Sequence, residues 1–159
     1  MAVCDILDVP TQVQLRPLQI LGDAKGAVMQ QSLPSIFIVD DEQLIGETLT
    51  MILQKSGFAA RFFTDPLEAL VEVRKQAPDL ILSDVMMPKL SGVDLAITIK
   101  NECPDCKIML FSGHAQTLDL LSVAREKGYD FNLLAKPLHP ADLLRHIRQQ
   151  FPDWTLVAD

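Results

Sequence analysis

The sequence predicts an α/β fold in which a doubly wound, five-stranded parallel sheet carries helices on both faces. Between residues 35 and 150, short apolar runs of strand length alternate with longer amphipathic stretches of helical period. The runs are nearly continuous in apolar side chains, which is typical of strands buried on both sides. Parallel neighbours need crossover connections, and right-handed crossovers place the helices on both faces of the sheet.

The first unit begins with the apolar run 36–40 (IFIVD), and a helix is predicted over residues 42–56. This helix has apolar residues at helical spacing, and Gly57 after it is a typical helix stop. A second strand is predicted over residues 59–63, where the strand pattern is weaker.

The next helix is predicted from its first residues, because Asp65 suits the cap position and Pro66 the first helical position. Residues 80–84 (LILSD) are the third predicted strand. A loop that contains Gly92 then leads into a predicted helix over residues 93–102.

The last two units follow the same pattern. Residues 107–112 (KIMLFS) are predicted as a strand, and residues 116–127 as a helix that ends before Gly128. Residues 132–136 (NLLAK) are the fifth predicted strand, and residues 141–150 the fifth helix.

The flanks differ from this organised domain of residues 35–150. Residues 1–34 show no clear period and are punctuated by proline and glycine, so they are predicted to be an irregular N-terminal extension. An alternative is that Met29 is the true translation start. Residues 151–159 are predicted to be a short C-terminal tail.

Composition indicates a globular protein and argues against several functions. The chain has 159 residues, 48% of them hydrophobic, and a net charge of −7. This charge repels polyanions, so we expect no direct nucleic-acid binding and no membrane association. No apolar run approaches the roughly 20 residues of a membrane span. Residues 1–10 contain no Lys or Arg and the cysteines number only three, so we expect a cytoplasmic protein.

Polar residues stand where the predicted strands end. These residues are Asp40, Asp41, Asp84, Ser112 and Lys136. The functional site of a doubly wound sheet lies outside the carboxyl ends of its strands, so we expect these side chains to converge. Converging carboxylates repel one another unless a hard divalent cation lies among them, and Mg²⁺ suits carboxylate, water and phosphate oxygens. An acceptor, a metal, a lysine and a hydroxyl are the parts that phosphoryl transfer needs.

Four motifs occur in order at these strand ends. They are the acids at 40–41, the run 83–88 (SDVMMP) followed by Gly92, the pair Ser112-Gly113 and the pair Lys136-Pro137. With these motifs, residues 35–150 resemble the receiver domain of two-component response regulators. The resemblance implies a flavodoxin-like (βα)5 fold with strand order 2-1-3-4-5, and a phosphorylation-dependent signalling switch rather than an enzyme.

The resemblance also implies roles for single residues. Asp84 matches the phosphoacceptor, which takes a phosphoryl group from a sensor histidine kinase or a histidine phosphotransfer protein. Lys136 matches the lysine that contacts the phosphoryl group, and its bond to Pro137 is expected to be cis. Ser112 matches the switch hydroxyl, which moves toward the phosphoryl group and draws the following loop with it.

Mg²⁺ is the cofactor that the resemblance implies. Asp41 and Asp84 match direct ligands of the ion, and Asp40 matches a residue that acts mostly through water. The backbone carbonyl of Met86 completes the ligands from the protein.

Two features depart from the family pattern. The switch aromatic of many receivers corresponds here to Leu133, so the coupling from Ser112 to the surface is either lost or carried by other side chains. Only residues 151–159 follow the last predicted helix, so we expect a stand-alone receiver with no attached output domain, acting on an unidentified downstream protein.

Two other functions are alternatives to the switch. A Mg²⁺-dependent phosphohydrolase with an aspartyl nucleophile would carry a second acid two residues after the nucleophile, where this chain has Met86. A degenerate receiver would act as a constitutive interaction module, and the retained Asp41, Asp84, Ser112 and Lys136 argue against it.

Two further patterns, a pair of cysteines and a histidine, can be explained as loop residues. Cys103 and Cys106 have C-x-x-C spacing, but no second ligand pair accompanies them, so we interpret them as loop residues. His114, two residues after Ser112, is either a polar loop residue or a residue that controls the access of water to the acyl phosphate.

Overall fold

The structure, a computed structural model, describes residues 32–154 of the chain. The predicted N-terminal extension, with the alternative start at Met29, lies almost entirely outside these residues. Residues 155–159 of the predicted C-terminal tail also lie outside them.

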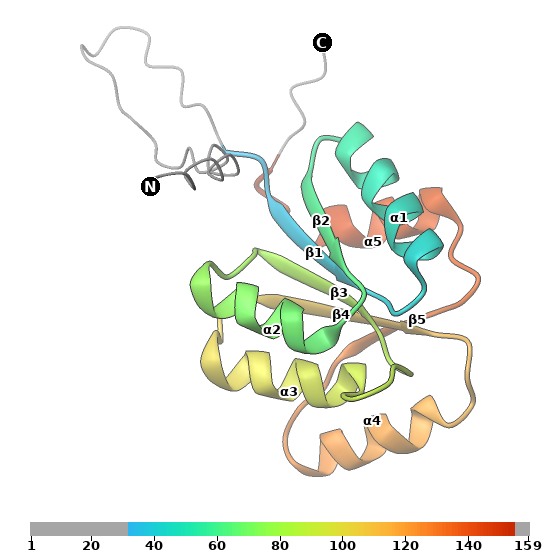
Figure 1. Cartoon of the computed structure of the whole chain (residues 1–159). Helices are drawn as coiled ribbons and strands as arrows, with labels where there is room; N and C mark the ends of the chain where they lie inside the picture. Colours follow the sequence, from blue (N-terminus) through green and yellow to red (C-terminus); the bar gives the residue numbers. More distant parts are fainter. Residues whose placement is uncertain (1–31, 155–159) are drawn as a thin grey trace, which may run out of the picture. The chain divides into compact units, whose positions relative to one another are not determined.

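Five parallel strands form one sheet with the order β2-β1-β3-β4-β5 (Figure 1). The parallel sheet expected from the alternating pattern and the strand order implied by the resemblance are both confirmed. Strand β1 lies between β2 and β3, and the order reverses there, so the switch point of the sheet falls between β1 and β3. The strands are β1 (Ser35–Val39), β2 (Ala59–Phe63), β3 (Leu80–Asp84), β4 (Lys107–Ser112) and β5 (Asn132–Ala135).

Five helices connect the strands and cover both faces of the sheet. Helices α1 and α5 lie on one face, and α2, α3 and α4 lie on the other (Figure 1). The helices are α1 (Gln43–Lys55), α2 (Pro66–Lys75), α3 (Gly92–Glu102), α4 (Thr117–Glu126) and α5 (Pro140–Gln149). All five predicted helices are present, and their ends differ from the predictions by a residue or so.

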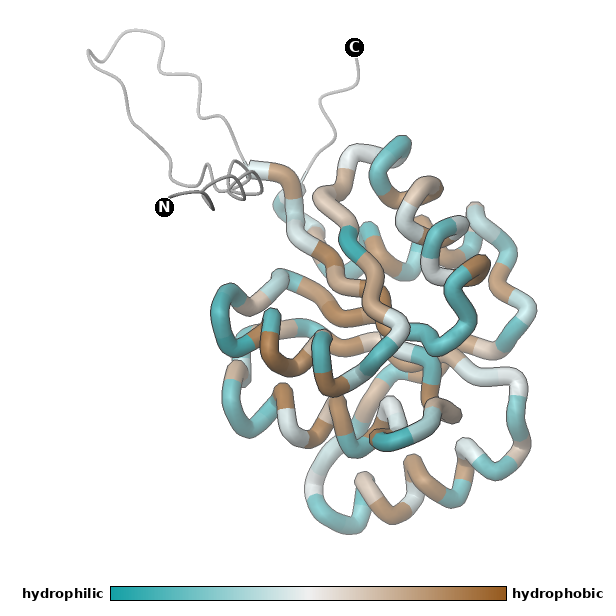
Figure 2. The backbone as a smooth tube through the Cα atoms, viewed as in Figure 1, coloured by the Kyte–Doolittle hydropathy of each residue, from teal (hydrophilic) through white to brown (hydrophobic). Residues whose placement is uncertain are grey.

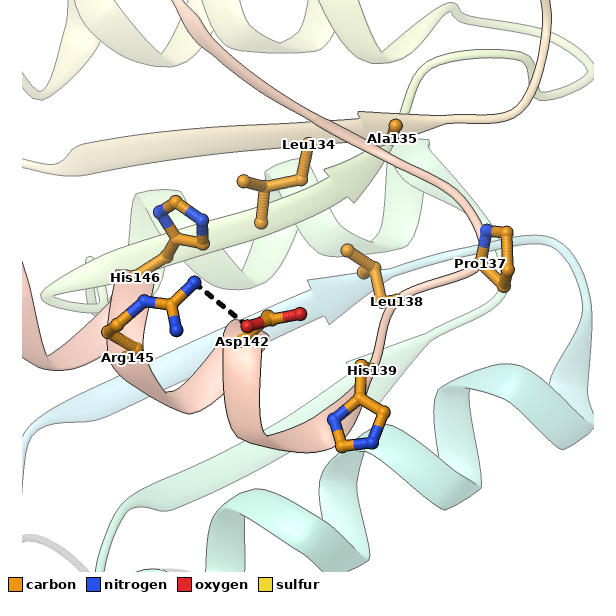
Figure 3. Close-up of a pocket in the computed structure, with 8 residues that line it drawn as sticks. All are labelled: Leu134, Ala135, Pro137, Leu138, His139, Asp142, Arg145 and His146. Carbon is orange, nitrogen blue, oxygen red and sulfur yellow. Dashed lines mark ion pairs between the residues drawn. The ribbon is translucent and has the colours of Figure 1, made fainter.

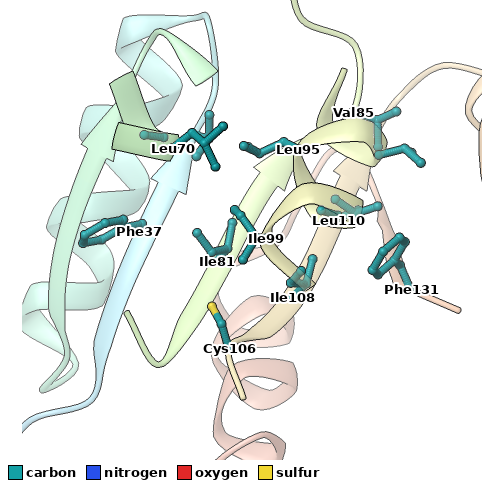
Figure 4. Close-up of a cluster of buried hydrophobic side chains, with 14 of the residues drawn as sticks. Phe37, Leu70, Ile81, Val85, Leu95, Ile99, Cys106, Ile108, Leu110 and Phe131 are labelled. Atoms are coloured by element: carbon teal, nitrogen blue, oxygen red, sulfur yellow. The ribbon is translucent and has the colours of Figure 1, made fainter. Parts of the chain in front are cut away.

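Each face of the sheet has its own hydrophobic cluster. The cluster under α2, α3 and α4 includes Phe37 and Ile81 of the sheet and Ile99 of α3 (Figure 4). The cluster under α1 and α5 includes Leu53 and Leu143. Successive strand residues point to opposite faces, so apolar residues at every position of a strand fill both clusters. Figure 2 shows this as hydrophobic colour along the strands and hydrophilic colour in many of the loops.

Local signals in the sequence set several helix ends. The Asp65 side chain accepts a hydrogen bond from the Leu67 N–H at 2.8 Å, and Pro66 is the first residue of α2. Gly57 after α1 has φ 92° and Gly128 after α4 has φ 94°, which is the left-handed conformation that glycine adopts most readily. The predictions of this cap and of these two stops are confirmed.

Aromatic residues beyond α5 extend the cluster under α1 and α5. The rings of Phe58 and Trp154 have centroids 4.8 Å apart, and Phe151 lies 6.2 Å from Phe58 on the same measure. The first residues of the predicted tail therefore pack against the domain. In residues 32–154 no helix has both the length and the apolar character needed to cross a membrane.

Candidate functional site

The carboxylates of Asp40, Asp41 and Asp84 meet at the carboxyl ends of β1 and β3, beside the switch point of the sheet. One oxygen from each carboxylate lies within 4.8 Å of those of the other two. Asp40 and Asp84 are buried, whereas Asp41 is exposed. The structure thus brings together the three acids that the strand ends predicted, with one of them open to solvent.

Asp40 is held by the sheet, by a helix and by a lysine. Its backbone N–H donates to the Phe63 carbonyl at 3.1 Å, which continues the pairing of β1 with β2. Its Oδ1 accepts a hydrogen bond from the Glu42 N–H at 2.9 Å, at the start of α1. Its Oδ2 lies 3.4 Å from Lys136 Nζ. Burial raises the pKa of the Asp40 carboxyl, against the opposing effects of the Glu42 N–H and the Lys136 ammonium.

Asp84 is the last residue of β3 and is only 5% exposed. Its Oδ2 lies 3.4 Å from Lys136 Nζ, while its Oδ1 is buried and has no hydrogen-bond partner among the described residues. Burial raises the pKa of the Asp84 carboxyl, against the opposing effects of the Lys136 ammonium and of the Val85 and Met86 N–H groups. The Ser83 hydroxyl donates to the Asp84 carbonyl at 2.8 Å and steadies the backbone there. Since unpaired buried oxygens are rare, Oδ1 is a candidate contact for a ligand.

Lys136 links the two buried carboxylates. Its Nζ is 3.4 Å from an oxygen of Asp40 and 3.4 Å from an oxygen of Asp84, and it lies 4.7 Å from the centroid of the Phe111 ring. Its backbone N–H donates to the Ser112 carbonyl at 3.0 Å, which ties the end of β5 to the end of β4. The Lys136-Pro137 peptide bond is cis, as predicted.

The acidic cluster fits a hard divalent cation by its donor chemistry. Three carboxylates and one ammonium leave a net negative charge at the site, and Oδ1 of the buried Asp84 has no hydrogen-bond partner within residues 32–154. The exposed Asp41 leaves the cluster accessible from solvent. Cations such as Mg²⁺ take a few carboxylates together with water and phosphate oxygens, which is the combination this open cluster offers.

Ser112 lies at the end of β4, and its hydroxyl accepts hydrogen bonds from two groups, of which Thr117 was not among the predicted site residues. Its Oγ accepts hydrogen bonds from the Thr117 hydroxyl at 2.6 Å and from the His114 N–H at 3.1 Å. Thr117 is 1% exposed and is the first residue of α4. A signal for Thr117 exists in the sequence, because it shares the buried helix face of Leu121 and Ala124 at spacings of four and seven residues.

The loop after β3 approaches the acid cluster through its backbone. The Gly92 N–H donates to the Val85 carbonyl at 2.8 Å. A Cβ on Gly92 would collide with the Asp84 carbonyl oxygen and lie 2.9 Å from the Val85 Cα, so only glycine fits this close approach. The Met86 side chain is 39% exposed, and the role of its carbonyl as a metal ligand stays a prediction.

Other residues from the sequence analysis lie around the site or away from it. Leu133 is partly buried and packs against the cluster under α2, α3 and α4. The His114 side chain is exposed. Cys103 and Cys106 are free thiols, and burial raises the pKa of Cys106 to about 12. A thiol with so high a pKa is a poor nucleophile, which argues against a redox role for Cys106. Both cysteines lie between α3 and β4, where the sequence predicted a loop.

A pocket separate from the acidic cluster lies between β5 and α5 (Figure 3). Leu134 and Leu138 contribute apolar surface to it, and an Arg145–Asp142 ion pair of 2.8 Å lies at one side. None of the residues predicted to perform the chemistry lines this pocket, so the candidate site is the acidic cluster at the strand ends.

Comparison with known families agrees with this fold and site. Residues 36–148 match the family described as "Response regulator receiver domain". The chain therefore belongs to the receiver domain family of response regulators. Phosphorylation and Mg²⁺ binding at an acidic pocket are typical of this family.

Two curated relatives show how much of the chain is matched. The chain is 32% identical over 114 residues to the transcriptional regulatory protein CreB of Escherichia coli, a match that covers 72% of this chain and 49% of CreB. It is 31% identical over 113 residues to the DNA-binding response regulator MtrA of Mycobacterium tuberculosis, which covers 71% of this chain and 48% of MtrA. The chain thus matches about half the length of these relatives.

Solved receiver domains show the same architecture. One from Methanospirillum hungatei, described as CheY-like, has a TM-score of 0.70 at 27% identity, and the match covers 77% of this chain and 96% of that one. One from Clostridium thermocellum has a TM-score of 0.68 at 29% identity, and the match covers 76% of this chain and 95% of that one.

Proposed function

We propose that this receiver domain accepts a phosphoryl group on Asp84 in a Mg²⁺-dependent reaction and so acts as a switch in a two-component phosphorelay. The observation that supports this most directly is the environment of Asp84. Its buried Oδ1 has no partner within residues 32–154, while its Oδ2 faces a lysine that also holds a second buried acid. The site is an acceptor with its counter-charge already in place.

The chemistry that we propose follows from these positions. An oxygen of the Asp84 carboxylate attacks the phosphorus of a phosphohistidine, so that an O–P bond forms as the P–N bond breaks and the imidazole leaves. The Lys136 ammonium is placed to meet one phosphoryl oxygen, and the Ser112 hydroxyl to meet another after it reorients. The product is an acyl phosphate on Asp84, and the transfer depends mainly on positioning and charge stabilisation.

Mg²⁺ belongs to this proposal as the cofactor. Asp41 and Asp84 would be direct ligands with the Met86 carbonyl, and Asp40 would act mostly through water. Asp40 suits that outer role because one of its oxygens binds the Glu42 N–H and the other faces Lys136. When bound, Mg²⁺ supplies positive charge to the phosphoryl oxygens.

The donor in this proposal is a sensor histidine kinase or a histidine phosphotransfer protein, and the target is a downstream protein. We propose a phosphoacceptor that assists its own phosphorylation rather than an enzyme with a separate substrate. The expectation of a receiver without an output domain stays a prediction, because the curated relatives named above are about twice as long as the matched region. The expectation that this chain does not bind nucleic acid directly also stays a prediction, because one of these relatives is a DNA-binding response regulator.

Incubation with Mg²⁺ and acetyl phosphate, followed by measurement of the intact mass, tests the proposal. We expect the wild-type protein to gain the mass of one phosphoryl group, and Asp84→Asn to gain none because an amide oxygen is not an anionic nucleophile. A control without Mg²⁺ should react much more slowly. Phosphate on Asp84→Asn at the wild-type rate would refute the assignment, and no phosphate on either protein would favour the degenerate receiver.

A further inference from the structure

The Ser112 hydroxyl is held by a partner at the start of α4. The Thr117 Oγ1 donates to Ser112 Oγ at 2.6 Å, and the His114 N–H donates to the same oxygen at 3.1 Å. Among the described residues no hydrogen bond joins Ser112 Oγ to Asp84 or to Lys136. The hydroxyl is therefore bound to α4 and its preceding loop rather than to the acidic site.

Thr117 is placed so that this bond matters energetically. It is 1% exposed, and the Ser112 hydroxyl is the one partner that the described structure gives its side chain. A buried hydroxyl that loses its partner is costly, because water cannot replace the lost hydrogen bond. Any motion of Ser112 away from Thr117 thus leaves a buried group unpaired, unless Thr117 moves as well.

Among the described residues, helix α4 has few polar contacts at this end. Its buried residues are Thr117, Leu121 and Ala124, whereas Leu118 is 65% exposed. Its N-cap residue, Gln116, makes no side-chain capping bond. Leu120 also packs against the cluster under α2, α3 and α4. The Ser112–Thr117 bond is the one side-chain hydrogen bond that the described structure gives the first turn of α4, so a change in this bond should affect that turn.

Residue 133 does not supply an alternative connection by an aromatic ring. Leu133 lies on β5 and packs into the same cluster as Leu121. Its aliphatic side chain has no polar atom that could form a hydrogen bond with the Ser112 hydroxyl. The hydroxyl of Thr117 is the polar group that already contacts Ser112 from α4.

We propose that Thr117 is a positioning residue that holds the Ser112 hydroxyl away from the phosphoryl site and transmits its release to the first turn of α4. This rests on the proposed phosphorylation of Asp84. In the free protein the Ser112–Thr117 bond favours the resting position of Ser112. When Ser112 turns to a phosphoryl oxygen, the bond breaks, and the first turn of α4 loosens because the Thr117 hydroxyl has lost its partner.

Thr117→Val tests this because valine keeps the shape and removes the hydroxyl. The probe is beryllofluoride with Mg²⁺, which mimics the phosphoryl group on an aspartate, titrated while backbone amide signals are followed by NMR. The resting state loses its stabilising bond, so we expect beryllofluoride to bind about threefold to tenfold more tightly to Thr117→Val, as the loss of one net hydrogen bond implies. Thr117→Ser keeps the hydroxyl and should bind within about twofold of wild type.

Amide hydrogen exchange is a second measurement. If Thr117 had only a structural role, exchange would not follow the pattern described next. In wild type we expect beryllofluoride to accelerate exchange at residues 117–120. In Thr117→Val these amides should exchange faster already without beryllofluoride, and the further change on binding should be small. Ser112→Ala supplies the double-mutant cycle, because the Val substitution should not alter beryllofluoride affinity when Ser112 is absent.

The outcomes separate the two ideas. Saturable binding with equal affinities for wild type and Thr117→Val would overturn the role of Thr117 and leave the proposed function standing. No saturable binding to wild type would overturn the proposed function and this inference with it. If Thr117→Val does not fold, Thr117→Ala replaces it, and the same tightening relative to Thr117→Ser is required.

Discussion

The substitution Asp84→Asn should have opposite effects on the stability of the protein without metal and with Mg²⁺. In the metal-free protein Asp84 lies within 4.8 Å of Asp40 and 3.4 Å from Lys136. At an effective dielectric constant of about 20 these distances give about 3 kcal/mol of repulsion and about 5 kcal/mol of attraction. The attraction to Lys136 thus exceeds the repulsion from Asp40, but by less than the several kcal/mol that burial of a carboxylate costs.

Burial therefore prevails, which agrees with the raised pKa of Asp84. A raised folded pKa means that the charged form destabilises the fold. The contribution of Asp84 to the free energy of unfolding is largest below its unfolded pKa of about 3.9 and falls as the pH rises toward the folded value. At neutral pH we expect Asp84→Asn to raise the metal-free free energy of unfolding by about 1 kcal/mol.

Mg²⁺ should reverse the order of the two proteins. At about ten times the dissociation constant, one bound ion adds about 1.4 kcal/mol to the free energy of unfolding. For a domain of this size that is an increase of about 4 to 7 °C in Tm. Asp84→Asn lacks one of the ligand charges and should gain little of this increment.

Thermal and urea unfolding with and without MgCl2, at matched ionic strength, measure both effects. Asp105→Asn is a suitable control, because Asp105 is an exposed acid in the α3–β4 loop and lies outside the cluster. It should leave the metal-free stability and the Mg²⁺ increment unchanged. The reasoning fails if Asp84→Asn is less stable than wild type without metal, or if it retains the full Mg²⁺ increment.

Two further predictions concern Gly92 and Cys106. Gly92→Ala should lower the free energy of unfolding by about 1 to 3 kcal/mol and slow phosphorylation, since the new methyl collides with the Asp84 carbonyl. Gly113→Ala is its control, because there the methyl meets only Lys136 Cβ at 3.5 Å, and equal urea midpoints for the two variants would count against the clash. Because burial raises the pKa of Cys106 to about 12, iodoacetamide at pH 8 should label Cys103 far faster than Cys106 in the folded protein and both at similar rates in urea. Equal labelling rates in the folded state, measured by peptide mass, would contradict this.

Much of the fold could be predicted from the sequence because its signals are periodic or local. Continuous apolar runs such as 80–84 identified buried strands, and the cap at Asp65 and the stop at Gly57 identified helix ends. The alternation of strand and helix patterns predicted a parallel sheet, so the acids after β1 and β3 were expected at the same edge of it, and the resemblance implied that these two strands are neighbours. Residues far apart in the chain could thus be placed together before any contact was known.

The contacts within the site depended on tertiary structure. No pattern in the sequence indicates that Lys136 Nζ lies equally far from Asp40 and Asp84, or that Asp84 Oδ1 has no donor among the described residues. The bond between Ser112 and Thr117 is of the same kind. Its formation depends on how α4 packs against β4, and differences of less than 1 Å between packed elements decide whether two hydroxyls meet. Periodicity sets which face of α4 is buried, whereas the packing of whole side chains sets these distances.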